Sequence, residues 1–231
     1  MDHGHHDHLG AVPAGGVARM IGRELAEHVP FTVIGAATGV VVAVVFLHGG
    51  FPAWWSARLF EVFHPLHVML SAVVTAAMYR LHTKGGIVKT VLIGYVGSVG
   101  IGTLSDCLLP YAGELLLAGA GGGGHIDAHA HIGFIEEWWL VNPLALLGVA
   151  IAIVWPRTKL PHAGHVLLST WASLFHMLMA MSGQVAVWMY AAVAGILFVA
   201  VWVPCCASDI VFPLLFAPRE AGAGGGGAER G

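Results

Sequence analysis

The segment His64-Pro65-Leu66-His67-Val68-Met69-Leu70-Ser71 recurs later in the chain as His162-Ala163-Gly164-His165-Val166-Leu167-Leu168-Ser169. Both copies follow the pattern H-x-x-H-V-x-L-S. A proline at position 65 or 161 marks each helix start, where the missing N–H of proline leaves no hydrogen bond unmade. Residues three apart on a helix share one face, so each copy presents two imidazoles side by side. This spacing is typical of a pair of metal ligands.

The rest of the chain is strongly apolar. Of its 231 residues, 57% are hydrophobic and only 10% are charged, and the mean hydropathy is +0.79. Such values are typical of membrane proteins. A bilayer core about 30 Å thick requires about 20 apolar residues per helix. We therefore predict an all-α integral membrane protein with six transmembrane helices, near residues 30–48, 65–82, 87–111, 138–155, 161–181 and 185–213.

The composition also excludes several classes of protein. Only ten Lys and Arg residues are present, so the chain offers no basic surface for nucleic acid. The three cysteines form no C-x-x-C pair, which argues against a redox dithiol. Fifteen histidines are the compositional outlier, and some of them lie in a His/Asp tract at residues 2–8, a composition that commonly binds metal.

Two further motifs recur in the same order as the histidine motif. Ser105-Asp106-x-x-x-Pro110 matches Ser208-Asp209-x-x-x-Pro213, and the Glu, Pro and Gly at positions 24, 30 and 35 match those at 137, 143 and 148. Three ordered matches indicate a duplication, and an odd number of helices per copy inverts the second copy in the membrane. We therefore predict two inverted three-helix repeats. The expected divisions are a tail and lead-in at 1–29, the first repeat at 30–117, a Gly/His-rich loop at 118–134, the second repeat at 135–217 and a Gly-rich tail at 218–231.

The distribution of positive charge predicts the orientation. If the N-terminus is cytoplasmic, all Lys and Arg residues except Arg58 face the cytoplasm, as the positive-inside rule requires. We expect both termini in the cytoplasm, the His/Glu-rich segment 111–137 outside, and the protein in the inner (plasma) membrane of a bacterium.

Inversion determines which polar residues can meet at the same depth. His64, His67 and Asp106 fall toward the outer side, where the Glu at the same depth is Glu137 from the other repeat. The equivalent inner group joins one residue of the first repeat to three of the second. Its members are His162, His165, Asp209 and Glu24. We predict two metal sites, each with two His, one Asp and one Glu.

The ligand types restrict the metal. Neutral imidazoles and carboxylates bind Zn, Mn, Fe, Co and Ni, and the absence of clustered thiolates disfavours Cu(I). The expected cofactor is a divalent transition metal, with zinc favoured. The motif serines, Ser71, Ser105, Ser169 and Ser208, either orient these ligands or bond their own helix carbonyls. His176 has Met78 as its counterpart in the first repeat, so we interpret it as a lone packed histidine.

Inverted repeats with a ligand set near each face favour a membrane transporter for divalent transition-metal ions. Proton coupling stays open, because these ligands lose protons when they bind metal. One alternative is an intramembrane zinc hydrolase that activates water against a lipid. Another is a haem-binding electron-transfer protein with axial histidines. We expect a transporter rather than an enzyme. Its expected partners are the lipid bilayer and metal ions, and not nucleic acid. Whether the chain forms a homodimer stays open.

Overall fold

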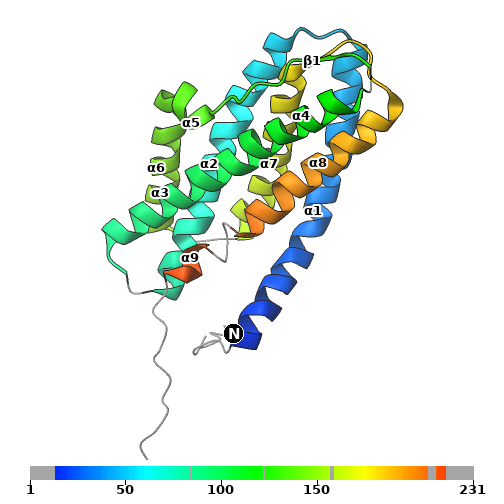
Figure 1. The fold of residues 1–231 in the computed structure, drawn as a ribbon. Helices are drawn as coiled ribbons and strands as arrows, with labels where there is room; N and C mark the ends of the chain where they lie inside the picture. Colours follow the sequence, from blue (N-terminus) through cyan, green and yellow to red (C-terminus); the bar gives the residue numbers. More distant parts are fainter. Residues whose placement is uncertain (1–13, 84, 122, 157–158, 208–211, 217–231) are drawn as a thin grey trace, which may run out of the picture.

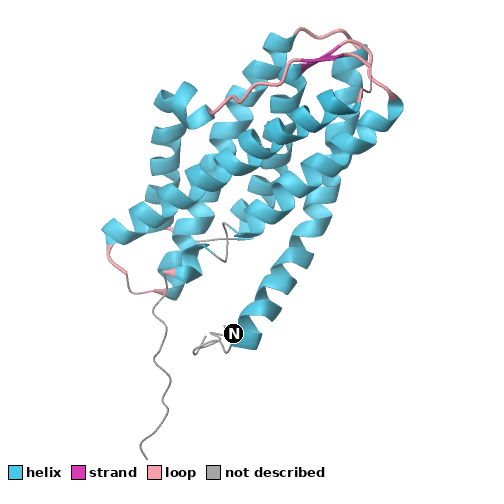
Figure 2. Cartoon of the chain, viewed as in Figure 1, coloured by secondary structure: helices cyan, strands magenta, loops and turns pink. Residues whose placement is uncertain are grey.

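The computed structural model describes residues 14–83, 85–121, 123–156, 159–207 and 212–216, and these are mostly helical (Figure 2). The long helices lie side by side in one bundle (Figure 1). In chain order the elements are α1 (Ala14–His48), α2 (Ala53–His82), α3 (Ile87–Thr103), the π-helical turn η1 (Leu104–Leu108), α4 (Leu109–Ala120), β1 (His125–Ile126), α5 (Gly133–Glu136), α6 (Trp138–Val154), α7 (Lys159–Ala180), β2 (Met181–Ser182), α8 (Val187–Cys206) and α9 (Phe212–Leu215).

Four helical segments of the described chain are long and apolar enough to cross a membrane. They are Val29–His48, Ala53–Leu81, Ile87–Ala120 and Val187–Cys205, and the shorter helix Trp138–Val154 is also apolar. The distribution of side chains agrees with this, because large apolar residues such as Val187 (84% exposed) lie on the surface while Asp106 and Glu114 are fully buried. In a lipid bilayer, apolar side chains face the lipid and charged side chains lie in the interior of the helix bundle. The chain has the helices of a membrane protein.

The helix α2 lies at the centre of the bundle and packs against α3, α6 and α7. The helix α1 packs against α7 and α8, whereas α6 packs against α2 and α3. The first helix of each half of the chain therefore packs on the other half. Two glycines permit the closest of these contacts: a Cβ at Gly35 would lie 2.8 Å from the Thr170 hydroxyl, and one at Gly148 would lie 2.9 Å from Ala72 Cβ. Small residues at such crossings are common between membrane helices.

The segments α3, η1 and α4 form one long rod that crosses the bundle diagonally (Figure 1). In the π turn, the N–H of Leu109 bonds the carbonyl of Leu104, five residues back. Pro110 follows and lacks the N–H that would bond the carbonyl of Asp106, so the α-helical ladder is interrupted here. The rod continues to Ala120, beyond the end at residue 111 expected from sequence, and Gly121 (φ 68°) ends it in the left-handed conformation.

One end of the bundle is covered by the segment 125–132, which we call the strap. Its start, β1, pairs antiparallel with β2 at the end of α7, with His125 opposite Ser182 and Ile126 opposite Met181. The N–H of Asp127 also donates to the carbonyl of Ala180 at 2.9 Å. The strap then crosses the helix ends and leads into α5, as Figure 1 shows. These backbone bonds fix its histidines over the interior of the bundle.

Candidate metal centre

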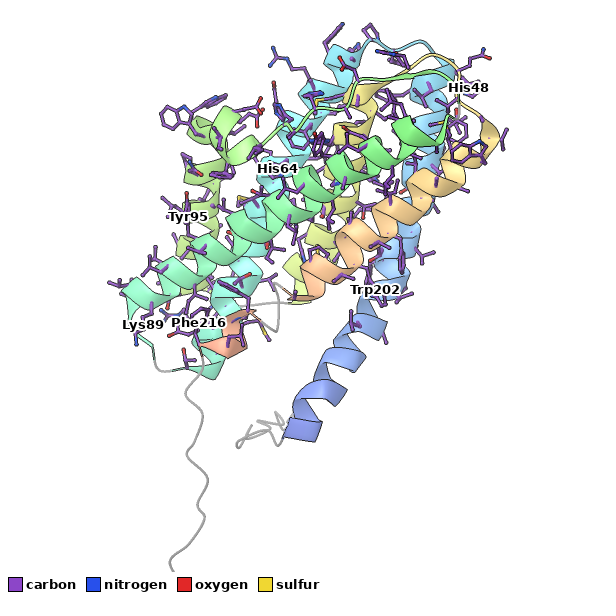
Figure 3. The ribbon with its side chains drawn as sticks, viewed as in Figure 1. His48, His64, Lys89, Tyr95, Trp202 and Phe216 are labelled. Carbon is purple, nitrogen blue, oxygen red and sulfur yellow. The ribbon has the colours of Figure 1, made fainter. Side chains whose placement is uncertain are left out.

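Two imidazoles and one carboxylate converge inside the bundle. His64 and His67 lie on one face of α2, and their Nδ1 atoms approach the same oxygen of Asp106, Oδ2, at 2.9 Å and 2.6 Å. All three side chains are fully buried. Ligand atoms from these residues lie within 4.8 Å of one another. Figure 3 labels His64, which lies beneath the strap.

The π turn explains how Asp106 reaches this position. Because Leu109 bonds the carbonyl of Leu104, the carbonyl of Ser105 is left without its α-helical donor, and the hydroxyl of Ser173 donates to it at 3.0 Å. The other carboxylate oxygen of Asp106, Oδ1, accepts hydrogen bonds from Ser105 and Ser169, both at 2.7 Å. Both carboxylate oxygens of Asp106 therefore have hydrogen-bond partners, and these bonds fix the side chain. The partners are needed because an unpaired charge in a deep apolar interior is very costly.

The arrangement fits a divalent transition metal. Zn–N distances of about 2.0–2.1 Å place neighbouring ligand atoms of a tetrahedral site roughly 3.3 Å apart. The two Nδ1 atoms already lie 2.9 Å and 2.6 Å from Asp106 Oδ2, so binding requires a small outward shift and a ring tautomer that carries its proton on Nε2 and leaves Nδ1 free to bind. The sequence predicted Asp106 beside this histidine pair, and the structure shows that both rings share one of its carboxylate oxygens.

The predicted fourth ligand, Glu137, lies close to this group. A Cβ built at Gly133 would lie 2.6 Å from His64 Nε2 and 3.1 Å from Glu137 Oε2, so the absence of a side chain at residue 133 lets the two approach. Within the described part of the chain, neither of these buried atoms has a hydrogen-bond partner. Glu137 therefore lies near the Nε2 side of the His64 ring, whereas Asp106 contacts its Nδ1, and the group of close ligand atoms consists of His64, His67 and Asp106.

The strap attaches to Glu137 through His131. His131 Nε2 bonds Glu137 Oε1 at 2.6 Å, and its Nδ1 lies 2.7 Å from Glu136 Oε2. Burial on its own lowers the pKa of His131, but the hydrogen bond to Glu137 and the charges of both glutamates outweigh it, so the pKa is raised. A raised folded pKa means that this contact contributes its full stability below the unfolded pKa, and loses it as the pH rises through the folded value.

The second H-x-x-H motif reaches the same region. His165 on α7 is fully buried and its ring stacks on His67, with ring centroids 5.9 Å apart and planes 11° apart. The two histidines were predicted to lie in separate outer and inner sites, whereas in the structure they are neighbours. Three other predicted ligands cannot be placed: Asp209 lies outside the described residues, as do the side chains of Glu24 and His162.

One polar pair was missed by the sequence analysis. His176 is not a lone histidine, because its Nδ1 lies 2.8 Å from Glu114 Oε1, and both side chains are fully buried. The sequence analysis ended the third helix at residue 111 and so left Glu114 outside the membrane. The apolar sequence Leu115-Leu116-Leu117 after Glu114 was the available signal that the helix continues.

The fold and site define the chain as an α-helical membrane protein with a buried His-His-Asp group that could hold a metal ion. No family model, no curated protein and no solved structure matches the chain. Its function is therefore argued from the site alone.

Replacing Ser169 by alanine tests the link between the two halves. Ser169 lies on α7 and donates to Asp106 Oδ1 at 2.7 Å, so S169A removes a bond that orients the carboxylate. We expect the metal affinity to fall roughly tenfold. This is the lower end of the effects typical for loss of a group that orients a metal ligand. The matched control is S98A, because Ser98 is also buried but bonds its own helix carbonyl, that of Tyr95. Equal affinities for the two variants, measured by isothermal titration calorimetry in detergent, would contradict the role of Ser169.

Proposed function

We propose that the protein transports divalent transition-metal ions, with zinc the first candidate, across the membrane. The observation that carries the proposal is the convergence of His64 and His67 on one oxygen of Asp106. Buried imidazole nitrogens around a single carboxylate match the N/O ligand sets of Zn, Mn, Fe, Co and Ni. A site fully buried between helices that can cross a membrane suits an ion in transit through the bundle.

The proposal includes six transmembrane helices arranged as two inverted repeats. Two contacts support it. His67 and His165 are equivalent positions of the repeated motif and their rings stack, as expected for residues beside a two-fold axis. Ala72 and Thr170 are also equivalent positions, and the repeat-related glycines Gly148 and Gly35 contact them respectively. Symmetric contacts of this kind arise when two homologous halves pack against each other around one axis.

One member of the second proposed ligand set lies at this axis. His165 is beside His67 of the first set, so the proposal places the two sets next to each other. Alternating access usually works around one central site, and two adjoining sets at the axis meet that requirement. In this proposal the strap faces the outside, both termini face the cytoplasm, and an ion passes from the first set to the second.

The geometry favours an ion over a haem group. Both Nδ1 atoms point to one carboxylate oxygen, whereas axial ligands of a haem iron approach from opposite faces of a porphyrin. An intramembrane hydrolase would share the metal but would turn over lipid without moving the ion. Transport is therefore the property that tests the proposal.

The test is metal uptake into proteoliposomes that contain a metal-sensitive dye, with Zn, Mn, Fe, Co and Ni offered separately. We expect uptake of at least one ion by the wild-type protein and at least about a tenfold lower rate for H67A, which removes a ligand. H48A is the matched control, because His48 is exposed and bonds the carbonyl of Val44 in its own helix. Absence of uptake by the wild type, or equal uptake by H67A, would refute transport through this centre.

A further inference from the structure

A second buried polar group lies beside the metal centre and is distinct from it. Glu114 on α4 and His176 on α7 bond each other at 2.8 Å, and both are fully buried. Among the residues that the structure describes, Glu114 Oε2 and His176 Nε2 have no hydrogen-bond partner. A buried carboxylate with one oxygen unpaired is costly when ionised. The two unpartnered atoms, Glu114 Oε2 and His176 Nε2, are therefore positions at which a proton can bind.

The pair lies between the strap and the metal centre. On one side the ring of His129 stacks on that of His176, with centroids 6.3 Å apart, and His129 is exposed. On the other side is the buried ring of Phe60, whose centroid is 5.6 Å from His176 and 5.0 Å from His64. His176 thus has the outer surface on one side and, across a single phenyl ring, a metal ligand on the other.

Charge balance connects the pair to the metal. A divalent ion at His64 and His67 meets one formal negative charge, that of Asp106. In an apolar interior the remaining positive charge is costly unless a second negative charge lies nearby. Glu137 already faces a His131 whose pKa is raised. Release of the proton from the Glu114 and His176 pair would supply that charge across Phe60.

We propose that Glu114 and His176 form a proton-binding site whose proton is exchanged for the transported metal ion. The inference rests on the proposed function and adds its coupling ion. When the metal binds, the pair loses one proton and Glu114 is left as a carboxylate. The proton reaches the outer solution through His129. When the metal leaves, the pair takes one proton back and is neutral again. The other titratable groups facing the pair are His131 on the strap and His64 on α2 across Phe60.

The test compares wild-type protein with E114Q, which keeps a hydrogen-bond acceptor for His176 but cannot ionise. Metal affinity is measured by calorimetry between pH 5.5 and 8, and proton release is counted in buffers of different ionisation enthalpy. Each proton that metal displaces adds a factor of about ten in affinity per pH unit. We expect E114Q to release about one proton fewer per ion and to lose that factor. In proteoliposomes it should carry metal down its gradient without moving protons in return.

The controls separate this inference from the proposed function. E61Q removes a half-buried carboxylate on α2 that is paired with Arg58, and it should behave as wild type. H176Q should reproduce the effect of E114Q, which keeps the test valid if one variant fails to fold. Unchanged proton release and pH dependence in both variants would overturn the proton site and leave metal transport standing. Failure of the wild-type protein to bind metal would refute the proposed function itself, and the coupling with it.

Discussion

Replacement of Asp106 by asparagine should abolish stoichiometric metal binding. The carboxylate oxygen Oδ2 is shared by His64 and His67, so the amide removes both a ligand and the negative charge that a divalent ion requires. The amide has nearly the same shape, and it can still accept from Ser105 and Ser169 if its oxygen takes the place of Oδ1. We expect the metal affinity to fall by at least about 100-fold, more than for loss of an orienting group.

The measurement is elemental analysis of purified protein together with calorimetric titration of zinc. E61Q is the control, because it also replaces a carboxylate by an amide, at a half-buried position where Glu61 pairs with Arg58. Equal retention of metal by D106N and wild type would show that the ion binds elsewhere, for example at the His-rich segment 2–8. A D106N protein that still migrates as a single species in detergent would show that the loss is not due to unfolding.

Replacement of Gly148 by valine should give the largest loss of stability. A Cβ at this position on α6 would overlap the backbone carbonyl oxygen of Met69 and lie 2.9 Å from Ala72 Cβ, both on α2. A backbone oxygen cannot move without the helix, so α6 must separate from α2. We expect a cost of about 3 kcal/mol, the upper range for overpacking, and a lower metal affinity, because α2 also carries both histidine ligands.

The control for this variant is G195V on α8. Gly195 is also helical, but it is exposed and has no atom within 4 Å of a Cβ built there. Thermal unfolding in detergent, followed by intrinsic fluorescence, should therefore show a much lower midpoint for G148V than for G195V. Similar midpoints would mean that α2 and α6 are not in close contact in the protein.

Much of the architecture could be predicted from local patterns. Apolar stretches of sufficient length predicted helices at positions close to those observed for α6 and α7. The start of the second helix was predicted wrongly, because α2 begins at Ala53 and Pro65 lies inside it. The prediction was wrong at the end of the third helix, which was expected at residue 111, with Glu114 in the segment outside the membrane. The helix continues to Ala120 because His176, far away in sequence, pairs with that carboxylate inside the bundle. No local pattern reports such a partner.

The duplicated motif gave two residues of the candidate site directly and pointed to the third. The i, i+3 spacing puts His64 and His67 on one helix face whatever the rest of the chain does, and the intramembrane Asp106 needed a polar partner. The π turn that aims Asp106 at them was not predicted, nor was the hydrogen bond from Ser169 in the other half. Both depend on how the rod formed by α3, η1 and α4 crosses α7.

The sequence by itself determined that this chain is helical and apolar, that an H-x-x-H motif occurs twice in it, and that His64 and His67 share one helix face. These properties follow from composition and periodicity, which act over a few turns of helix. Only the tertiary structure decided that His67 lies against His165, that Glu137 approaches His64 beside Gly133, and that Glu114 is buried with His176. These contacts depend on how helices far apart in the sequence cross each other. A buried polar group without a partner is costly, so crossings that bring polar groups together, such as Glu114 and His176, are favoured.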